Sequence, residues 1–436
     1  MKQNNKRYKN QYLLPTLLLF LTFNQIFDLS AQNIQYITVN NYQQPQLVIQ
    51  LTSVAGTPYD ECVITDCTFT ECVSDQSGGG LYTRVNNNKK ITVNGTNTFR
   101  SCSAFTGGGW YAIIFDRGKM LMQGYVTVTD CFSTQNGGDG GGGMSIVVTG
   151  AESLLTIEAE ILFTNCRSSS QGGGMELYGN VASLIEITGK LTFNNCSCAN
   201  GRGGGLDALR SPIFVIGFIQ LLGEITCFNC SASTTGGTYN GCGGGVNFEF
   251  PADDTVYINK ITCTDCKANE GGGLYFTCDN WNYLEIRTTY IFPQSMCFSG
   301  CEALTGSGGG ICIEVHHTDV EFNPIDLESQ ILFDHCNAKL SGGGIYLQQG
   351  EAQYTNYNKM KFSECKATNG GGLFTLITGQ GILTLSYCEF YQCQSNGGNG
   401  GGVYFEVNFA PVIQIKIQDT TIHDCEAITN SSSTYP

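Results

Sequence analysis

Hydrophobic and polar positions follow one pattern that returns about a dozen times along this chain. A clear copy begins at Phe333, has Cys336 three residues later, and continues through a polar stretch to the glycine triplet 342–344. Apolar Ile345 and Leu347 follow the triplet with one residue between them. Such alternation is typical of a β-strand with one buried face, because successive side chains point to opposite faces.

Twelve cysteines in a regular series mark the copies. The first and the last lie 353 residues apart over eleven intervals, so one copy is about 32 residues long. An apolar residue stands three positions before each cysteine, and in eight copies it is phenylalanine. The cysteines are Cys72, Cys102, Cys131, Cys166, Cys196, Cys230, Cys266, Cys301, Cys336, Cys365, Cys393 and Cys425.

A third strand-like stretch, such as 155–157 or 185–187, usually precedes the phenylalanine. Three short strands per copy predict one coil of a solenoid, and the short apolar runs and frequent glycines disfavour a helical repeat. We therefore predict an all-β fold, a parallel β-helix of about twelve coils. Stacked at the inter-strand spacing of about 4.8 Å, the coils would make a rod on the order of 55–60 Å long.

Glycine triplets recur in eleven copies and are expected at a corner of the coil, where they permit positive φ and close approach of successive backbones. Phenylalanines in register are expected to stack as a ladder inside the rod. The stretch between cysteine and triplet varies from four residues (103–106) to twelve (231–242), which predicts loops projecting from that corner. In solenoids, such insertions are where binding usually occurs.

The pattern also divides the chain. Residues 1–31 have a basic start, an apolar core at 13–23 and a small residue at Ala31, which predicts a secretory signal peptide; an uncleaved anchor is the alternative. No second apolar stretch is long enough for a membrane helix.

The rest of the chain divides into a cap, the repeats and a tail. Residues 32–61 lack the motif but alternate like strands, and we expect an N-terminal β cap there. The repeats occupy residues 62–428. The polar tail 429–436 either caps the last coil poorly or marks a truncated product, and we favour truncation.

The chain is acidic. Without residues 1–31 it retains 18 basic and 36 acidic residues, a net charge of −18. A surface of this sign repels nucleic acids and anionic polysaccharides, so we expect no nucleic-acid partner. No motif for a cofactor is present, and none is expected.

Phe-x-x-Cys followed by Gly-Gly-Gly and an aliphatic residue resembles the repeats of chlamydial polymorphic outer membrane proteins (Pmp), whose signatures are Phe-x-x-Asn and Gly-Gly-Ala-(Ile/Leu). The resemblance covers nearly the whole chain after residue 61. It implies a right-handed β-helix of the pectin-lyase-like superfamily and a cell-surface or adhesin role. Cysteine replaces asparagine throughout, and no C-terminal autotransporter barrel follows.

These departures fit a eukaryotic protein that is extracellular or displayed on the cell surface. Asn94, Asn195, Asn229 and Asn430 begin sequons for N-glycosylation. Asn195 and Asn229 lie inside the repeat, where a glycan would be crowded.

The chain has 22 cysteines, and in a secreted protein this number favours disulfides in part of the ladder. The alternative is a ladder of buried thiols. The pairs Cys227/Cys230 and Cys263/Cys266 look like a zinc ribbon. Residues three apart in a strand face opposite sides, however, so we predict no metal site.

The residue between the two apolar positions after each triplet is expected to face solvent. Read along the rod, this row is aromatic at both ends and polar in the middle. Exposed aromatic rings stack on sugars, so glycans are candidate ligands, and the alternative is that the rings stack on one another. The predicted ligand-binding residues are Tyr82, Tyr111, Tyr275, Tyr346, Phe374 and Tyr404.

Glu176 and Asp207 belong to the same row on adjacent coils, near the ~5 Å separation of a retaining glycosidase. They are the only catalytic candidates, and no basic or histidine neighbour is evident on the row. We predict a structural or adhesive protein that binds glycans or surface proteins. The alternatives are a polysaccharide lyase or glycoside hydrolase of the same fold, and a purely architectural spacer.

Overall fold

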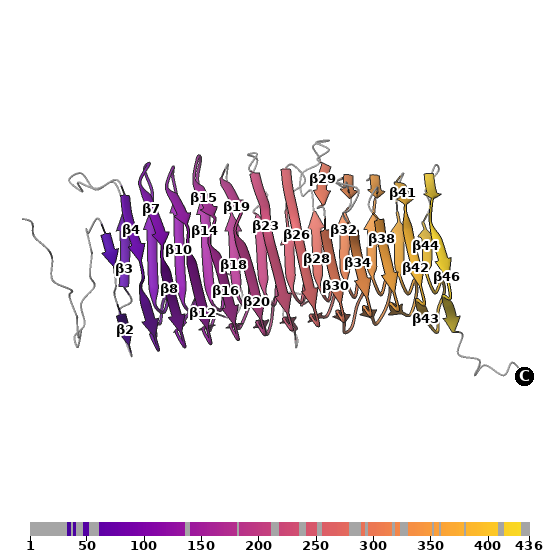
Figure 1. The fold of residues 1–436 in the computed structure, drawn as a ribbon, viewed down its shortest axis with the longest axis horizontal. Coiled ribbons are helices and arrows are strands. Elements are labelled where there is room, and N and C mark those ends of the chain that lie inside the picture. The colour runs from indigo at the N-terminus through magenta and orange to yellow at the C-terminus, as the bar shows by residue number, and fades with distance from the viewer. Residues whose placement is uncertain are drawn as a thin grey trace, which may run out of the picture.

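A computed structural model of the chain shows an elongated parallel β-helix, which confirms the predicted fold class (Figure 1). Strands lie across the long axis of the rod, and the chain advances along it coil by coil. Each coil passes through three parallel sheets, which contain 24, 12 and 11 strands and are called sheets A, C and B here.

The structure describes residues 33–35, 38–40, 47–51, 61–135, 140–180, 183–210, 218–234, 241–250, 255–278, 289–292, 295–315, 319–322, 330–350, 353–356, 359–378, 381–408 and 414–428. The predicted signal peptide and the tail 429–436 lie outside these ranges. Within them, the chain has no helix of the length and apolarity needed to cross a membrane.

Sheet A contains two arms of each coil. The first arms are β1 (Asn33–Gln35), β4 (Glu61–Thr65), β7 (Lys90–Asn94), β11 (Lys119–Met122), β15 (Leu154–Ile157), β19 (Leu184–Ile187), β29 (Thr289–Phe292), β33 (Asp319–Phe322), β37 (Gln353–Asn356), β41 (Ile382–Ser386) and β45 (Gln414–Gln418). The second arms are β2 (Thr38–Asn40), β5 (Thr68–Thr70), β8 (Thr96–Arg100), β12 (Tyr125–Thr129), β16 (Glu160–Thr164), β20 (Lys190–Asn194), β30 (Ser295–Ser299), β34 (Gln330–Asp334), β38 (Lys359–Ser363), β42 (Cys388–Tyr391) and β46 (Thr421–His423). Two long strands run through both arms, β23 (Phe218–Phe228) and β26 (Thr255–Thr264).

The short strands of sheet B directly follow the ladder cysteines from Cys102 onward. Its strands are β9 (Ser103–Ala104), β13 (Phe132–Ser133), β17 (Arg167–Ser168), β21 (Ser197–Cys198), β24 (Ser231–Ala232), β27 (Lys267–Ala268), β31 (Glu302–Ala303), β35 (Asn337–Ala338), β39 (Lys366–Ala367), β43 (Gln394–Asn396) and β47 (Glu426–Ile428).

The strands of sheet C follow the glycine triplets, except for β3, which belongs to the predicted cap. Its strands are β3 (Leu47–Leu51), β6 (Leu81–Val85), β10 (Trp110–Phe115), β14 (Met144–Thr149), β18 (Met175–Gly179), β22 (Leu206–Arg210), β25 (Val246–Glu249), β28 (Leu274–Cys278), β32 (Ile311–Val315), β36 (Ile345–Gln349), β40 (Leu373–Ile377) and β44 (Val403–Val407).

A left-handed residue turns the chain between sheets A and B. His335, with φ of 52°, separates β34 from Cys336, so that Phe333 and Cys336 both point into the core. The expectation that residues three apart in the motif, such as Cys227 and Cys230, face opposite sides is therefore wrong, because the turn reverses the alternation. The residue before every ladder cysteine has positive φ: Glu71, Ser101, Asp130, Asn165, Asn195, Asn229, Asp265, Gly300, His335, Glu364, Gln392 and Asp424.

Each glycine of a triplet is required for a different reason. Gly342 has φ of 66°, a conformation that side chains with a Cβ disfavour. A Cβ on Gly343 would lie 2.5 Å from the carbonyl oxygen of Lys366, and one on Gly344 would lie 2.5 Å from Cδ1 of Phe362. Both collisions are with the next coil, so the triplet sets how closely coils stack.

The predicted phenylalanine ladder is present in the core. The ring of Phe333 stacks on Phe298 and Phe362 at centroid distances of 5.4 and 4.7 Å. Where cysteines replace the ladder phenylalanine, at Cys227 and Cys263, sheet C supplies fully buried aromatic rings in the same two coils, Phe248 and Phe276. The core volume is thereby conserved, which packed interiors require.

The two ends of the rod differ. Strands β1, β2 and β3, from the predicted cap, pair in parallel with β4, β5 and β6 of the next coil. At the other end, Ile417 and Ile422 are 50% and 55% exposed, although their register partners Leu385 and Phe390 are buried. No described strand covers this last coil.

The stacking argument predicts unequal effects for the same substitution in two triplets. Gly344→Ala should lower the free energy of unfolding by about 1–3 kcal/mol or more, because its Cβ meets the Phe362 ring and the Gly372 carbonyl. Gly402→Ala is the control, since its nearest neighbour would be Cγ2 of Ile422 at 3.0 Å on the open last coil. Thermal denaturation measures both, and equal losses would contradict the argument.

Candidate functional site

The residues between the two apolar positions after each triplet form one continuous row on sheet C, called the sheet C row here. Parallel pairing places its members in register on neighbouring coils: Tyr82, Tyr111, Ser145, Glu176, Asp207, Asn247, Tyr275, Cys312, Tyr346, Phe374 and Tyr404. The structure thus brings all the predicted ligand-binding and catalytic residues together in one line.

The expectation that this row faces solvent is wrong for most of its length. Glu176 and Asp207 are 1% and 0% exposed, and Tyr275 and Phe374 are 9% and 5% exposed. Ser145, Asn247 and Cys312 are also buried, whereas Tyr82, Tyr111, Tyr346 and Tyr404 are half-buried. Strand alternation gives the face of the sheet that a side chain occupies, but it does not give what covers that face.

Glu176 binds the segment that leads from sheet B into sheet C in the preceding coil. The backbone N–H of Gly140 and the hydroxyl of Ser145 donate hydrogen bonds to its Oε2 at 2.8 and 2.9 Å. Gly140 directly precedes the triplet 141–143. The carboxylate therefore joins the sheet C row to the corner that leads into the same sheet.

Asp207 is the second buried carboxyl group. The Nδ2 of Asn247 donates to its Oδ1 at 2.7 Å, while Asp207 Oδ2 and Asn247 Oδ1 have no hydrogen-bond partner among the described residues. Burial raises the pKa of Asp207 to about 6, and the charge of Arg202 and the bond from Asn247 offset part of the rise. Arg202 itself forms an ion pair with Glu249.

The polar part of the row can hold a proton, but its geometry is unfavourable for glycoside hydrolysis. A retaining glycosidase brings both carboxyl groups against one glycosidic bond. Here both groups are enclosed, and the contacts of Glu176 and Asp207 are directed to the protein's own backbone and amide groups.

Three row residues, Tyr275, Cys312 and Tyr346, form a separate cluster with Cys242, which directly precedes the triplet 243–245. The hydroxyl of Tyr275 donates to Glu314 Oε2 at 2.8 Å, and burial raises the pKa of Tyr275 well above its usual value. Burial and the charge of Glu314 also raise the pKa of Glu270. These groups are arranged for hydrogen bonding within the protein.

Aromatic members of the row stack on one another, as the alternative interpretation proposed. Tyr82 stacks on Tyr111 with a centroid distance of 5.7 Å, and Tyr346 stacks on Phe374 at 5.4 Å. Tyr404 lies 5.5 Å from Phe374 in a tilted arrangement. Only the half-buried tyrosines keep ring surface available to a ligand.

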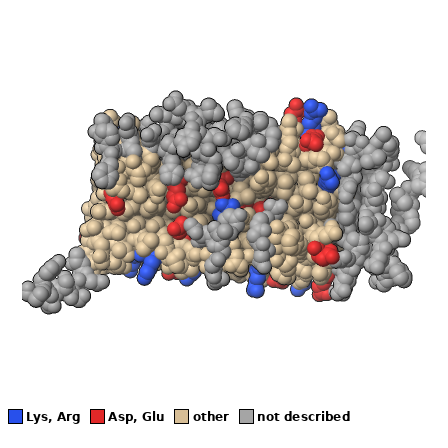
Figure 2. Space-filling model, turned by 180° about the vertical axis from the view of Figure 1, so that it is seen from behind, with Lys and Arg blue, Asp and Glu red and all other residues tan. Residues whose placement is uncertain are grey.

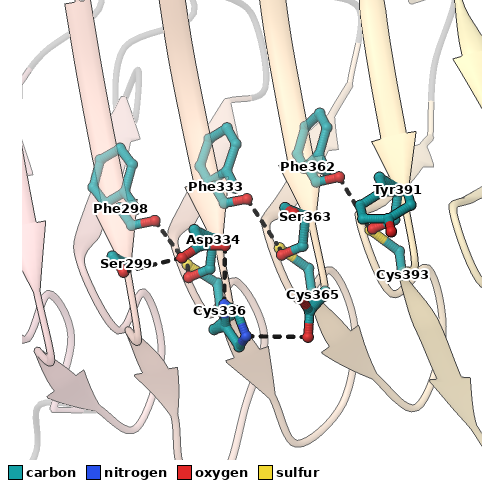
Figure 3. Close-up of polar contacts among 12 residues, drawn as sticks. Phe298, Ser299, Phe333, Asp334, Cys336, Phe362, Ser363, Cys365, Tyr391 and Cys393 are labelled. Atoms are coloured by element: carbon teal, nitrogen blue, oxygen red, sulfur yellow. Dashed lines mark hydrogen bonds and ion pairs between the residues drawn. The ribbon is translucent and has the colours of Figure 1, made fainter.

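The cysteine series forms a buried ladder of thiols (Figure 3). Cys336 Sγ donates to the carbonyl oxygen of Phe298 at 3.4 Å, and Cys365 donates to that of Phe333 at 3.6 Å, each bridging to the preceding coil. The structure holds all 22 cysteines without a disulfide, so the expected partial bridging is not found. In-register side chains leave the corner in the same direction, and for eight of the twelve ladder thiols a carbonyl oxygen of the preceding coil lies within hydrogen-bond reach.

Cys227, Cys230, Cys263 and Cys266 all point into the core, although the sequence argument placed each pair on opposite faces. The described residues contain no group of three or more His, Cys, Asp or Glu side chains placed to hold a metal ion. His335 instead bridges Asp334 and Glu364 at the surface, at 2.9 and 3.1 Å. The hydrogen bond that the His335 imidazole donates to the Asp334 carboxylate raises the pKa of His335.

Sequence reasoning missed Arg202, Glu249 and Glu314. They surround the row from the corner segments and from outward positions further along sheet C. One signal for the two glutamates was present: each follows the second apolar residue after a triplet, so it lies on the same outer face as the row.

Comparison of the chain with protein-family models, with curated proteins and with solved structures finds no match.

Replacing Asp207 should make stability less dependent on pH. Its folded-state pKa of about 6 lies above the unfolded value of about 4, so its contribution is greatest below pH 4 and is lost as pH rises through 6. Asp207→Asn should therefore raise the free energy of unfolding at pH 8 by up to about 3 kcal/mol, which a higher melting temperature reports. At pH 4 the substitution should change the free energy of unfolding little. Exposed Glu406→Gln is the control, and a larger gain at pH 4 than at pH 8 would refute the assignment.

Alkylation of the native protein should label two cysteines. Cys297 and Cys425 are half-buried and the other cysteines are buried, so iodoacetamide should modify these two first. Partial burial raises the pKa of both thiols, and the reaction should accelerate from pH 7 to pH 9. Peptide mass spectrometry locates the labels. Prompt modification of ladder residue Cys336 would contradict the packing.

Proposed function

We propose that the chain is a secreted or cell-surface β-helix protein with a structural or adhesive role. The observation that carries the proposal is the continuity of the three parallel sheets along the rod, combined with the enclosure of the row that holds the candidate catalytic residues. A rod of stacked coils presents long side faces and corner loops, which suits a protein that spans distance and makes contacts along its length.

The proposal includes kinship with Pmp-type repeat proteins and with pectin-lyase-like β-helices. Its support is the place that each half of the motif takes in the coil. Phe-x-x-Cys forms one corner of the coil and the glycine triplet forms another, so the two halves of the motif have separate structural tasks in each copy. A repeat family of this kind would keep both halves while its loops vary.

The charges of the outer faces also support binding to neutral partners. Figure 2 shows acidic and basic side chains interspersed over one face of the described residues, without a large patch of either sign. Along sheet A, Glu224 pairs with Lys260 at 2.9 Å and with Lys190 at 3.9 Å on the neighbouring coils. Such ladders neutralise the surface locally despite the acidic composition.

Neutral glycans are the proposed ligands, bound at the half-buried tyrosines of the sheet C row. Tyr82 and Tyr111 form one aromatic pair, and Tyr346 and Tyr404 flank Phe374 in a second group. The lyase or hydrolase alternative would need Glu176 and Asp207 to become accessible, and no observation favours it over binding.

Binding to a neutral glycan array, followed by product analysis, tests this function. The full chain should be retained on at least one neutral polysaccharide without shortening it, and Tyr82→Ala with Tyr111→Ala, or Tyr346→Ala with Tyr404→Ala, should weaken retention at least tenfold. Tyr125→Ala is the control, because Tyr125 is 58% exposed on strand β12 of a different sheet. Shortened products would instead support the enzyme, and no retention at all would leave the architectural spacer.

A further inference from the structure

We propose that Asn94 carries an N-linked oligosaccharide, and that Asn195 and Asn229 exclude each other as attachment sites. The inference rests on the proposed secretory route, because this modification occurs there. It goes beyond that route by naming which of the described sequons the fold can accommodate. The three sites differ in how their side-chain amides are used.

Asn94 is exposed at the end of strand β7, where the chain turns through Gly95 with φ of 66°. Its Oδ1 accepts a hydrogen bond from the Gly95 N–H at 2.7 Å, so the turn uses the oxygen of the amide and leaves the nitrogen for the sugar. Thr96, the hydroxyl residue of the sequon, is also exposed. A glycan here would extend from the corner between the two arms of sheet A into solvent.

Asn195 and Asn229 lie at a different corner. Each is the left-handed residue before a ladder cysteine, and each is exposed. Their amides belong to an external ladder, in which Asn229 Nδ2 donates to Asn195 Oδ1 at 2.7 Å and Asn195 Nδ2 donates to Asn165 Oδ1 at 3.3 Å. One glycan can leave this ladder outward from the corner.

Two glycans cannot do so on neighbouring coils. The Nδ2 atoms of Asn195 and Asn229 are separated by one coil, which is about 4.8 Å of stacking distance. A branched oligosaccharide is a bulky surface group, wider than that spacing. A chain modified at both positions would have to separate its coils, and the backbone hydrogen bond that the Asn195 N–H donates to the Phe228 carbonyl oxygen, at 2.9 Å, opposes that separation.

The reaction is a transfer from a polyprenyl-pyrophosphate-linked oligosaccharide. A bond forms between Asn Nδ2 and C1 of the first sugar, and the bond from C1 to the phosphate oxygen breaks. Nδ2 loses one proton, and polyprenyl pyrophosphate leaves. One N–H remains on each modified amide, so a single glycan is compatible with one hydrogen bond of the ladder.

The test uses the full chain 1–436 produced in a eukaryotic secretory host behind an added signal sequence, so that entry does not depend on residues 1–31. Intact mass and peptide mapping after enzymatic deglycosylation should find Asn94 occupied. Thr96→Ala should remove that glycan, and Thr96→Ser should keep it. Asn195→Gln should leave occupancy of Asn229 unchanged or raise it.

An unoccupied Asn94, or molecules that carry glycans at both Asn195 and Asn229, would overturn the inference. The chain with only its own N-terminus is examined in parallel for appearance in the medium or at the cell surface. Its retention inside the cell would count against the proposed function alone, because occupancy is measured on the chain with the added signal.

Discussion

Every coil of this protein has to superpose on the next at a spacing of about 4.8 Å, and the parallel backbone ladder that follows is the constraint on which the rest of the structure depends. The strands meet this spacing through ordinary parallel pairing, whereas the corners between strands need special backbone conformations. A left-handed residue before each cysteine makes one corner, and a glycine triplet makes another. The triplet allows the closest approach, since a Cβ at Gly343 would collide with main-chain atoms of the next coil.

The same repetition determines how the core is filled. Identical side chains stack in register, so Phe298, Phe333 and Phe362 form a ladder of parallel rings. Where a smaller side chain replaces the ladder phenylalanine, a larger one fills the core elsewhere in the same coil. Phe248 does so in the coil of Cys227, and Phe276 does so in the coil of Cys263. The ladder cysteines contribute small apolar groups, and thiols such as those of Cys336 and Cys365 donate to a carbonyl of the preceding coil. A thiol suits this position because its desolvation is inexpensive and it still offers a donor.

The repeat predicted the fold class, the ladder of phenylalanines and the register of the sheet C row, because each depends on period and alternation alone. It did not predict the direction of Cys230 or Cys266, because a positive φ at the preceding residue reverses the alternation that a strand would have. It also did not predict the burial of Glu176 and Asp207. That burial depends on contacts such as the one from Gly140, between a corner segment and another coil, and corner segments vary in length and sequence from copy to copy.

The buried carboxyl groups show where recognition can occur on this fold. Enclosing Glu176 and Asp207 reduces stability relative to apolar residues of similar size, and the polar contacts of such groups can specify one arrangement over others. Here the arrangement specified is the path of a corner segment, through the bond between Gly140 and Glu176. The inner faces of the sheets are occupied by the core, and the middle of the sheet C row is occupied by contacts within the chain. Differences in binding among proteins built on this repeat should therefore reside in the corner loops and in the half-buried tyrosines at the two ends of the row.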